Sequence, residues 1–351
     1  MRNGYAYEIV FSFWGGESMP IALITGITGQ DGRHMAEFLL SKNYTVYGMV
    51  NRQREDLAIG LKKEFPDLIQ VKGDLADSVS LRNIIAETLP DEVYNFGAIS
   101  FVGLSFQQPE LTANITGLGV LRLIEAIRLS GMENRTRIYQ ASSSEMFGKV
   151  EEIPQTEKTR FHPRSPYGVA KVFAHNACVN YREAYGMYIS CGILFNHEGE
   201  RRGTEFVTRK ITKGLARIKL GLQAEIMLGN LDAKRDWGYA GDYVEAIWMM
   251  LQQPEPDDYV IATGVTHSVR EFLQCAIDIL KIEEEFDSII HLDPKFNRPS
   301  EVDLLIGDAS KAKKILGWEP KVGFEELVKK MVMHDLKEEA LLAGLSVPLL
   351  K

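Results

Sequence analysis

A glycine-rich turn near the start of the chain constrains the fold more than any other feature of the sequence. Residues 26–32 read GITGQDG, a G-x-x-G-x-x-G pattern that follows a short apolar run at 21–24. Met35, Phe38 and Leu39 then recur at the spacing of a buried helix face. Glycines in such a strand–turn–helix unit let backbone N–H groups approach a pyrophosphate at the start of the helix. The predicted dinucleotide contacts from this turn are Gly26, Thr28, Gly29, Gln30, Asp31 and Gly32.

Strands and helices continue to alternate after this turn. Further strands are predicted at 45–50, 68–72, 92–96 and 138–140, and a long helix at 118–126. Strands that alternate with helices pair in parallel and carry helices on both faces of the sheet. The predicted fold class is therefore α/β, a Rossmann-type doubly wound parallel sheet with ligands at the carboxyl ends of its strands.

The alternation becomes irregular beyond about residue 190, where a smaller lobe is expected. The clusters at 196–203 and 294–301 are predicted to be loops of that lobe. The predicted division is a dinucleotide-binding domain of 19–190 plus about 238–265, and a substrate-binding lobe of about 191–237 plus 266–345.

Composition excludes several classes of function. The net charge is −8 over 351 residues, without a dense Lys/Arg block, which argues against nucleic-acid and acidic-membrane binding. No apolar run approaches the roughly 18–20 residues of a membrane span. The three cysteines (Cys178, Cys191 and Cys275) form no C-x-x-C pair, so we expect no metal site and a reducing cytoplasm. Residues 1–18 show no clear cleavage site and are expected to be a poorly ordered extension or an interface segment.

The end of the second predicted strand indicates which dinucleotide is bound. An NAD site has an acidic residue there to bind the ribose hydroxyls. This chain reads MVNRQR at 49–54, with no carboxylate. Arg52 and Arg54 can pair with a 2′-phosphate, which favours NADP over the alternative of a solvated basic loop. After the third strand, Asp74 of the Gly73-Asp74-Leu75 segment can accept a hydrogen bond from the adenine amino group.

A Y-x-x-x-K pair follows the nucleotide-binding half. Tyr167 and Lys171 are four residues apart, so a helix brings both side chains to one face. A nearby ammonium stabilises phenolate, so we expect the pKa of Tyr167 to be lowered until it is a usable base. The serine cluster at 142–144, just upstream, makes this common spacing more specific.

The segments GITGQDG, ASSSE and SPYGVAK together resemble the extended short-chain dehydrogenase/reductases. Three later segments, GILFNHEGERRGTEFVTRKIT, LGNLDAKRDWGYAGDYVEA and RPSEVDLLIGDASKAKKILGW, are similar to bacterial GDP-mannose 4,6-dehydratases. The resemblance runs from about Pro20 to Leu336 and implies a triad of hydroxyl, Glu and Tyr with a supporting Lys. The implied catalytic residues are Ser143, Glu145, Tyr167 and Lys171, with Ser143 in place of the Thr of many relatives.

The resemblance also implies a mechanism of internal redox with elimination. Tyr167 takes the proton of the carbon 4 hydroxyl while hydride passes from that carbon to NADP. Glu145 then removes the proton of carbon 5, the carbon 6 hydroxyl leaves as water, and hydride returns to carbon 6. A simple oxidoreductase needs no such carboxylate, so Glu145 favours a dehydratase over the alternative of a helix cap.

The remaining site residues are implied by position in the matched segments. Further cofactor contacts would come from Phe96, Gly97, Ala98, Ser100, Leu111, Tyr167, Lys171, His197 and Arg202. The GDP-sugar would be held by Ser100, Ser143, Glu145, Asn196, Lys210, Arg235, Arg298 and Glu301. Arginine suits a diphosphate because its planar donor fork is bidentate, although the C-terminal arginines could instead form surface ion pairs.

Two departures from the family pattern leave alternatives open. Ile99 stands where relatives have Gln, which leaves the sugar open, and a GDP-manno-heptose dehydratase is the main alternative. The loop after Arg52 also differs, which weakens the inference of a tetramer, so a homodimer or a homotetramer is expected. A nucleotide-sugar reductase or epimerase is less favoured because Glu145 is present. A non-catalytic NADP-sensing protein is disfavoured because the whole catalytic set is intact.

Overall fold

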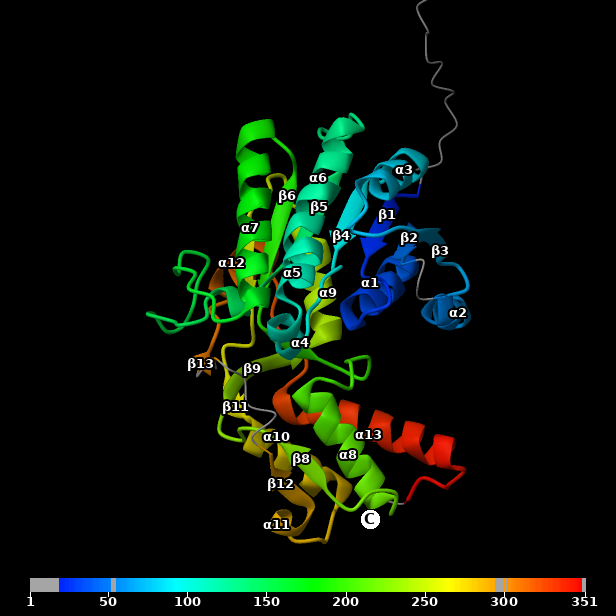
Figure 1. The fold of residues 1–351 in the computed structure, drawn as a ribbon, viewed down its shortest axis with the longest axis vertical. Coiled ribbons are helices and arrows are strands. Elements are labelled where there is room, and N and C mark those ends of the chain that lie inside the picture. The colour runs from blue at the N-terminus through cyan, green and yellow to red at the C-terminus, as the bar shows by residue number, and fades with distance from the viewer. Residues whose placement is uncertain (1–18, 52–54, 294–299, 301, 303, 349–351) are drawn as a thin grey trace, which may run out of the picture.

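The chain forms a large sheet-based part and a smaller, mostly helical part (Figure 1). The computed structural model describes residues 19–51, 55–293, 300, 302 and 304–348. The large part occupies the upper half of Figure 1, and the C-terminal end lies in the lower part. None of the helices in these described ranges is long and apolar enough to cross a membrane.

A seven-stranded sheet forms the centre of the large part, and all neighbouring strands are parallel. The order across the sheet is β10-β6-β5-β4-β1-β2-β3. The strands are β1 (Ile21–Thr25), β2 (Thr45–Val50), β3 (Ile69–Lys72), β4 (Glu92–Asn95), β5 (Arg137–Ser143), β6 (Ile189–Leu194) and β10 (Asp258–Ile261). This arrangement confirms the predicted doubly wound sheet.

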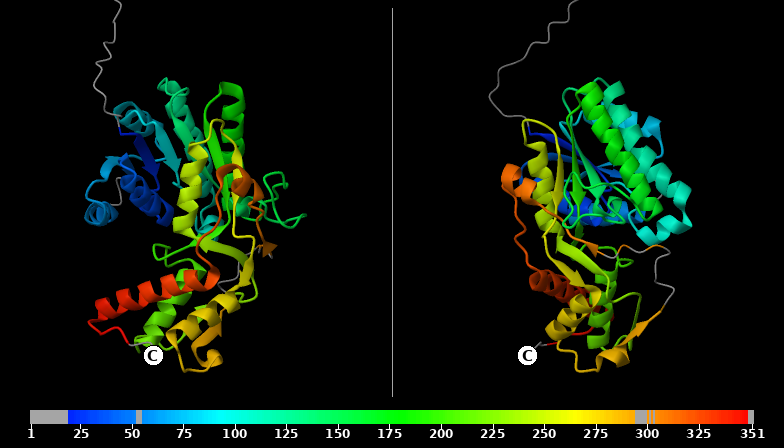
Figure 2. Two further views of the ribbon diagram at one scale, coloured as in Figure 1. Left: turned by 180° about the vertical axis from the view of Figure 1, so that it is seen from behind. Right: turned by 90° about the vertical axis from the view of Figure 1, so that its left-hand side faces the viewer.

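Helices cover both faces of this sheet, as the right-hand view of Figure 2 shows. One face is covered by α3 (Ser78–Thr88), α6 (Gly119–Leu129) and α7 (Pro166–Tyr185), whose apolar residues join the strands in one buried cluster. The other face carries α1 (Gln30–Ser41), α2 (Glu55–Glu64), α9 (Ala240–Leu251) and α12 (Ser310–Leu316). Short turns follow β4 and β5: α4 (Val102–Gln107), α5 (Pro109–Thr112), the π-helical η1 (Ala113–Leu118) and the 3-10 turn η2 (Ser144–Met146).

The smaller part is built around three helices that share a second core. These are α8 (Val207–Lys219), α10 (Val269–Leu280) and α13 (Phe324–Ala343), with α11 (Phe286–Ile289) beside them. Strand β9 (Lys234–Tyr239) pairs with β7 (Asn196–Glu198), β11 (Thr266–Ser268) and β13 (Leu304–Leu305), and β8 (Ile226–Leu228) pairs with β12 (Ile290–Leu292).

The structure differs from two local expectations and leaves a third untested. The predicted loop at 196–203 begins with strand β7, because Asn196–Glu198 pairs in parallel with β9. The predicted boundary at residue 190 falls inside β6, and α12 packs back against the large sheet at β10 and α9. The cluster at 294–301 lies almost wholly outside the described residues. The assignment of the two parts to cofactor and sugar stays a prediction.

Two glycines of the predicted turn are required by close backbone packing. Gly26 has φ +67°, and a Cβ there would lie 2.7 Å from the backbone nitrogen of Gly97. A Cβ on Gly32 would lie 2.4 Å from the carbonyl oxygen of Gly26. Since both neighbours are backbone atoms, neither can move aside. The missing side chains therefore let helix α1 begin directly against the end of β1 and the segment after β4.

We predict that Gly32→Ala lowers the free energy of unfolding by about 1–3 kcal/mol, the usual cost of overpacking. Gly60→Ala is the matched control, because Gly60 lies inside α2 with open space around its Cβ position. That variant is expected to be about 0.5–1 kcal/mol more stable, since alanine is the better helix former. Urea denaturation of both variants measures the difference. Equal stability of the two variants would contradict the packing argument.

Candidate active site

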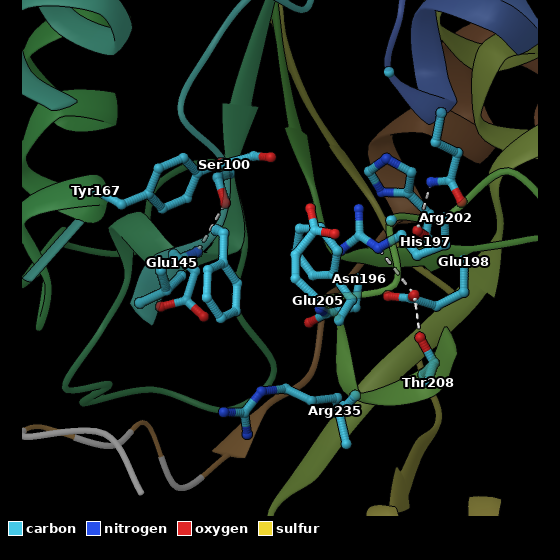
Figure 3. Close-up of a pocket in the computed structure, with 18 of the residues that line it drawn as sticks. Ser100, Glu145, Tyr167, Asn196, His197, Glu198, Arg202, Glu205, Thr208 and Arg235 are labelled. Atoms are coloured by element: carbon cyan, nitrogen blue, oxygen red, sulfur yellow. Dashed lines mark hydrogen bonds and ion pairs between the residues drawn. The ribbon is translucent and has the colours of Figure 1, made fainter. Parts of the chain in front are cut away.

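A large pocket lies between the carboxyl ends of the central strands and the smaller part (Figure 3). Its volume is about 1160 Å³, which is ample for a dinucleotide and a second ligand. The glycine turn, the segments after β4 and β5, helix α7, residues 194–210 and strands β8 and β9 all contribute to its lining. The ends of the parallel strands thus supply the site, as doubly wound sheets require.

Most of the residues predicted for the site line this one pocket. From the glycine turn and the sheet they are Gly26, Thr28, Gly29, Gln30, Asp31, Gly32, Phe96, Ala98 and Ser100. From β5 and α7 they are Ser143, Glu145, Tyr167 and Lys171, and from the later segments Asn196, His197, Arg202, Lys210 and Arg235. Residues 52, 54, 298 and 301 lie outside the described part of the chain, so the predictions for Arg52, Arg54, Arg298 and Glu301 stay open.

Four predicted cofactor residues lie elsewhere. Gly97 packs against Gly26, and Leu75 packs against Gly97. Both residues therefore contact the glycine turn or its neighbour without lining the pocket. Asp74 lies at the end of β3, where it accepts a hydrogen bond from Asn51 at 2.7 Å. Leu111 lies on α5 with 46% of its surface exposed, and the fold does not bring it to the pocket.

Glu145 and Tyr167 lie on one wall of the pocket (Figure 3), and Ser143, which is hydrogen-bonded to the backbone of Glu145, lines the pocket with them. Ser143 ends β5, and its hydroxyl oxygen accepts a hydrogen bond of 3.2 Å from the backbone N–H of Glu145. Ser165 caps α7 by accepting a hydrogen bond of 3.0 Å from the N–H of Gly168. Tyr167 therefore lies in the first turn of the helix. A Cβ on Gly168 would lie 2.7 Å from the carbonyl oxygen of Glu145. This glycine therefore lets the turn carrying Tyr167 approach the turn carrying Glu145.

Lys171 lies one helical turn below Tyr167 and is buried. Its Nζ donates a hydrogen bond of 2.5 Å to the carbonyl oxygen of Ala141 and lies 5.7 Å from the centre of the Tyr167 ring. Burial lowers the pKa of Lys171 to about 8, against the opposing charge of Asp31.

The expectation that Lys171 lowers the pKa of Tyr167 is wrong for this structure. Burial raises the pKa of Tyr167 to about 12, and the hydrogen bond with Ser143 offsets only part of that rise. The charge of Glu145 raises the pKa further. The physical reason is that burial disfavours the charged phenolate, while the ammonium of Lys171 is engaged by the carbonyl oxygen of Ala141.

A buried chain of polar side chains that sequence reasoning missed leads to that carbonyl. Thr25 donates to Asn95 at 2.5 Å, and Asn95 donates to Gln140 at 2.6 Å. Gln140 then donates to the carbonyl oxygen of Ala141 at 3.0 Å, the acceptor that also holds Lys171. The three side chains come from β1, β4 and β5, which are adjacent only in the folded sheet. No local motif marks them in the sequence.

His197 and Asp31 form an ion pair on the opposite side of the pocket. His197 Nε2 lies 3.0 Å from a carboxylate oxygen of Asp31, and Nδ1 lies 2.8 Å from the carbonyl oxygen of Phe195. Since both ring nitrogens face acceptors, the geometry favours the doubly protonated ring. Burial lowers the pKa of His197, but the charge of Asp31 and its hydrogen bond outweigh burial and raise the pKa. Burial likewise raises the pKa of Asp31, and His197, Arg202 and Gln30 more than offset it, so that pKa is lowered.

Arg202 is held beside this pair by a second carboxylate, Glu198. Arg202 Nε lies 3.0 Å from Glu198, and Thr208 donates to the same carboxylate oxygen at 2.5 Å. The guanidinium of Arg202 lies 3.5 Å from the ring centre of Phe206. Glu198 is 2% exposed and was not among the predicted site residues, although it lies within the matched segment.

Ile99, the main departure from the family pattern, does not line the pocket. Its backbone N–H donates to Thr116 at 3.0 Å, and its side chain is half-buried. In this structure the Gln-to-Ile difference therefore changes no residue of the pocket wall directly.

We predict that Asp31→Asn lowers the free energy of unfolding by about 1.5–3 kcal/mol, the value of a charge-assisted hydrogen bond. A raised His197 pKa contributes stability below its ordinary value of 6.5 and loses it as the pH rises further. A lowered Asp31 pKa contributes above 3.8 and loses it as the pH falls. The difference between wild type and variant should thus be full between these two values, shrink as the pH rises above 6.5, and shrink as the pH falls below 3.8. A constant difference up to strongly basic pH, measured by urea denaturation, would contradict the ion pair.

Comparisons with known proteins agree with this geometry. The family model described as GDP-mannose 4,6 dehydratase matches residues 23–331. A GDP-mannose 4,6-dehydratase of Vibrio cholerae serotype O1 is 50% identical over 352 residues, covering 91% of this chain and 94% of that protein. The Arabidopsis thaliana GDP-mannose 4,6 dehydratase 1 is 52% identical, covering 92% of each chain, and the Homo sapiens protein is 48% identical, covering 92% and 93%.

Solved structures with the same fold include a complex with NADPH and a UDP-glucose 4-epimerase. The NADPH complex of RMD from Pseudomonas aeruginosa has a TM-score of 0.77 at 25% identity, covering 91% of this chain and all of that one. UDP-glucose 4-epimerase of Thermotoga maritima with UDP-glucose has a TM-score of 0.79 at 25% identity, covering 92% and 99%. The family match over most of the chain and the relatives near 50% identity show that this chain belongs to the GDP-mannose 4,6-dehydratase family.

Proposed function

We propose that the protein is an NADP-dependent GDP-mannose 4,6-dehydratase, a hydro-lyase that converts GDP-D-mannose to GDP-4-keto-6-deoxy-D-mannose and water. The observation that carries the proposal is the position of Glu145 beside Ser143 and Tyr167 on one wall of the pocket. A hydroxyl and a phenol suffice for oxidation at carbon 4. A carboxylate on the same wall supplies the base that elimination from carbon 5 needs.

The residues of the pocket fit NADP. The N-terminus of α1 lies at the pocket, next to a turn in which Gly26 and Gly32 have no room for a Cβ. The backbone N–H groups of this turn are therefore not shielded by side chains at these two positions, which suits a bound phosphate. The fold neighbour from Pseudomonas aeruginosa was solved with NADPH. We assign Lys171, His197 and Arg202 to the cofactor as well, because they line the same pocket as the turn. NADP bound in this pocket would supply the hydride acceptor for carbon 4, the hydride donor for carbon 6 and, in its oxidised form, a positive charge, and Tyr167 and Lys171 line the same pocket.

The acid–base steps fall to the chain's own residues. Tyr167 receives the proton of the carbon 4 hydroxyl, and Ser143 hydrogen-bonds the carbon 4 oxygen. Because burial raises the pKa of Tyr167 to about 12, the phenolate requires cationic neighbours, of which Lys171 is one. Glu145 removes the carbon 5 proton and delivers it to the departing carbon 6 hydroxyl, which leaves as water. The proton that Tyr167 received then passes to carbon 5. Because the hydride removed from carbon 4 is returned to carbon 6, the reaction has no net redox change.

The GDP-sugar is assigned to the end of the pocket opposite the glycine turn that is assigned to NADP. Asn196, Lys210 and Arg235 line it from β7, α8 and β9. Arg235 extends from β9 toward the side on which Glu145 lies, as Figure 3 shows. A planar guanidinium there suits the diphosphate of the substrate. Ser100 lines the same pocket, and we assign it to the sugar and the nicotinamide.

Three finer points of the proposal concern selectivity and assembly. A GDP-manno-heptose remains the alternative substrate, and product analysis with each sugar distinguishes the two.

We propose a homodimer or a homotetramer, supported by large apolar side chains exposed on α7 such as Val169 and Phe173. We also propose a cytoplasmic location, in keeping with three free cysteines.

We predict that Glu145→Gln abolishes measurable dehydration, a loss of about 10²–10⁴-fold as expected for a general base. NADP affinity should stay within about twofold, because Glu145 lies on the wall assigned to the sugar. The variant should still oxidise carbon 4 in a single turnover, which is seen as absorbance of reduced nicotinamide.

Tyr167→Phe is the matched comparison for Glu145→Gln. It should lose the single-turnover absorbance as well as the product, because the proton acceptor for the first step is removed. Undiminished product formation by Glu145→Gln would contradict the assignment of Glu145 and the dehydratase mechanism with it.

A further inference from the structure

Two buried polar atoms face the same point of the chain, at Gly199 just after β7. Among the described residues, neither Gln30 Oε1 nor His34 Nε2 has a hydrogen-bond partner, and the two residues are 7% and 5% exposed. A Cβ built on Gly199 would lie 3.6 Å from each of these atoms and 3.5 Å from the ring of Tyr239. Both atoms therefore border one small space beside the glycine.

The hydrogen bonds of Gln30 determine which of its amide atoms faces that space. Its Nε2 donates to a carboxylate oxygen of Asp31 at 3.1 Å and to the carbonyl oxygen of His197 at 3.0 Å. Both partners are acceptors only, so the reversed amide would bring three oxygens together. The atom facing Gly199 is therefore the carbonyl oxygen, which can only accept.

The protonation of His34 follows from its other nitrogen. Arg201 Nη1 lies 3.2 Å from His34 Nδ1, and a guanidinium can only donate. Nδ1 is thus an acceptor, the ring is neutral, and Nε2 carries the proton. Burial lowers the pKa of His34, and the charge of Arg201 lowers it further, against the opposing charges of Glu200, Asp31 and Glu37. A donor at His34 and an acceptor at Gln30 therefore border the same space.

We propose that this space is a binding site for one water molecule. The water accepts from His34 Nε2–H and donates to Gln30 Oε1. Glu200, whose carboxylate lies 4.0 Å from His34 Nε2, is within reach of its second proton. Three such partners are typical of buried waters in proteins. Glycine at position 199 keeps the volume available.

The water site ties the first turns of α1 to the segment that carries His197 and Arg202. Gln30 already links these two segments, because its amide nitrogen donates to the carboxylate of Asp31 on α1 and to the carbonyl oxygen of His197. This consequence rests on the proposed function: if His197 and Arg202 bind NADP, then Gly199 and His34 are positioning residues for the cofactor.

Three variants separate the water from its neighbours. Gly199→Ala fills the space without a clash, because 3.5–3.6 Å is ordinary contact distance. His34→Gln places an amide N–H near the position of Nε2 and keeps the donor to the water. His34→Asn keeps an acceptor for Arg201 near the position of Nδ1 but loses the donor. Circular dichroism and thermal denaturation establish that each variant is folded.

The direct test is a crystal structure of the wild-type protein at a resolution that shows ordered water, together with Gly199→Ala. We expect density within hydrogen-bond distance of Gln30 and His34 in the wild type and none in the variant. The dissociation constant for NADP should rise on the order of tenfold in Gly199→Ala and His34→Asn, and less than about twofold in His34→Gln. The double variant His34→Asn/Gly199→Ala should be no weaker than either single variant, since both lose the same water.

Wild-type crystals without this density would overturn the proposal, as would additive effects in the double variant or equal affinities of His34→Asn and His34→Gln. Density for the water in a protein that binds no NADP would support the site and contradict the proposed function instead.

Discussion

The ion pair between Asp31 and His197 joins the helix after the glycine turn to a strand that lies 166 residues later in the sequence. Asp31 lies in the first turn of α1, where a dinucleotide phosphate is expected, and an unpaired carboxylate there would repel it. His197 supplies a compensating positive charge, and Arg202 supplies a second. The ring of His197 stacks on Tyr243 of α9 with centroids 4.9 Å apart, which fixes its plane. This ion pair thus joins the first turn of α1 to β7 across the pocket.

The wall that carries the proposed chemistry depends on close packing of a different kind. Gly168 lets the first turn of α7 lie against the backbone at Glu145, so Tyr167 and Glu145 share one side of the pocket. Lys171, which is buried, donates to the carbonyl oxygen of Ala141 one helical turn from Tyr167. A buried phenol with a raised pKa stays protonated until positive charge is brought close to it. We infer that binding of the oxidised cofactor and activation of Tyr167 are coupled for this reason.

Local patterns were enough to predict the sheet, the glycine turn and the Tyr167/Lys171 pair, whereas most other residues that line the pocket were implied by the resemblance to the family. The strand–glycine–helix unit at 21–39 and the Tyr167/Lys171 spacing each lie within one stretch of sequence, and the parallel sheet brings both to one edge. The position of Leu111 was not predictable in this way, because it depends on how the short helices after β4 turn outward. The link from Thr25 to Lys171 depends on strand neighbours, and the raised pKa of Tyr167 depends on burial.

The central claim is that hydrogen removed from carbon 4 returns to carbon 6 of the same sugar. GDP-mannose carrying deuterium at carbon 4 tests this claim most directly, with the product examined by mass spectrometry and NMR. We expect a 4-keto-6-deoxy product with one deuterium in the carbon 6 methyl group and no lasting reduction of the cofactor. Deuterium that accumulates in NADPH, or a product whose methyl group is unlabelled, would contradict internal hydride transfer and with it the assignment of this protein as a dehydratase.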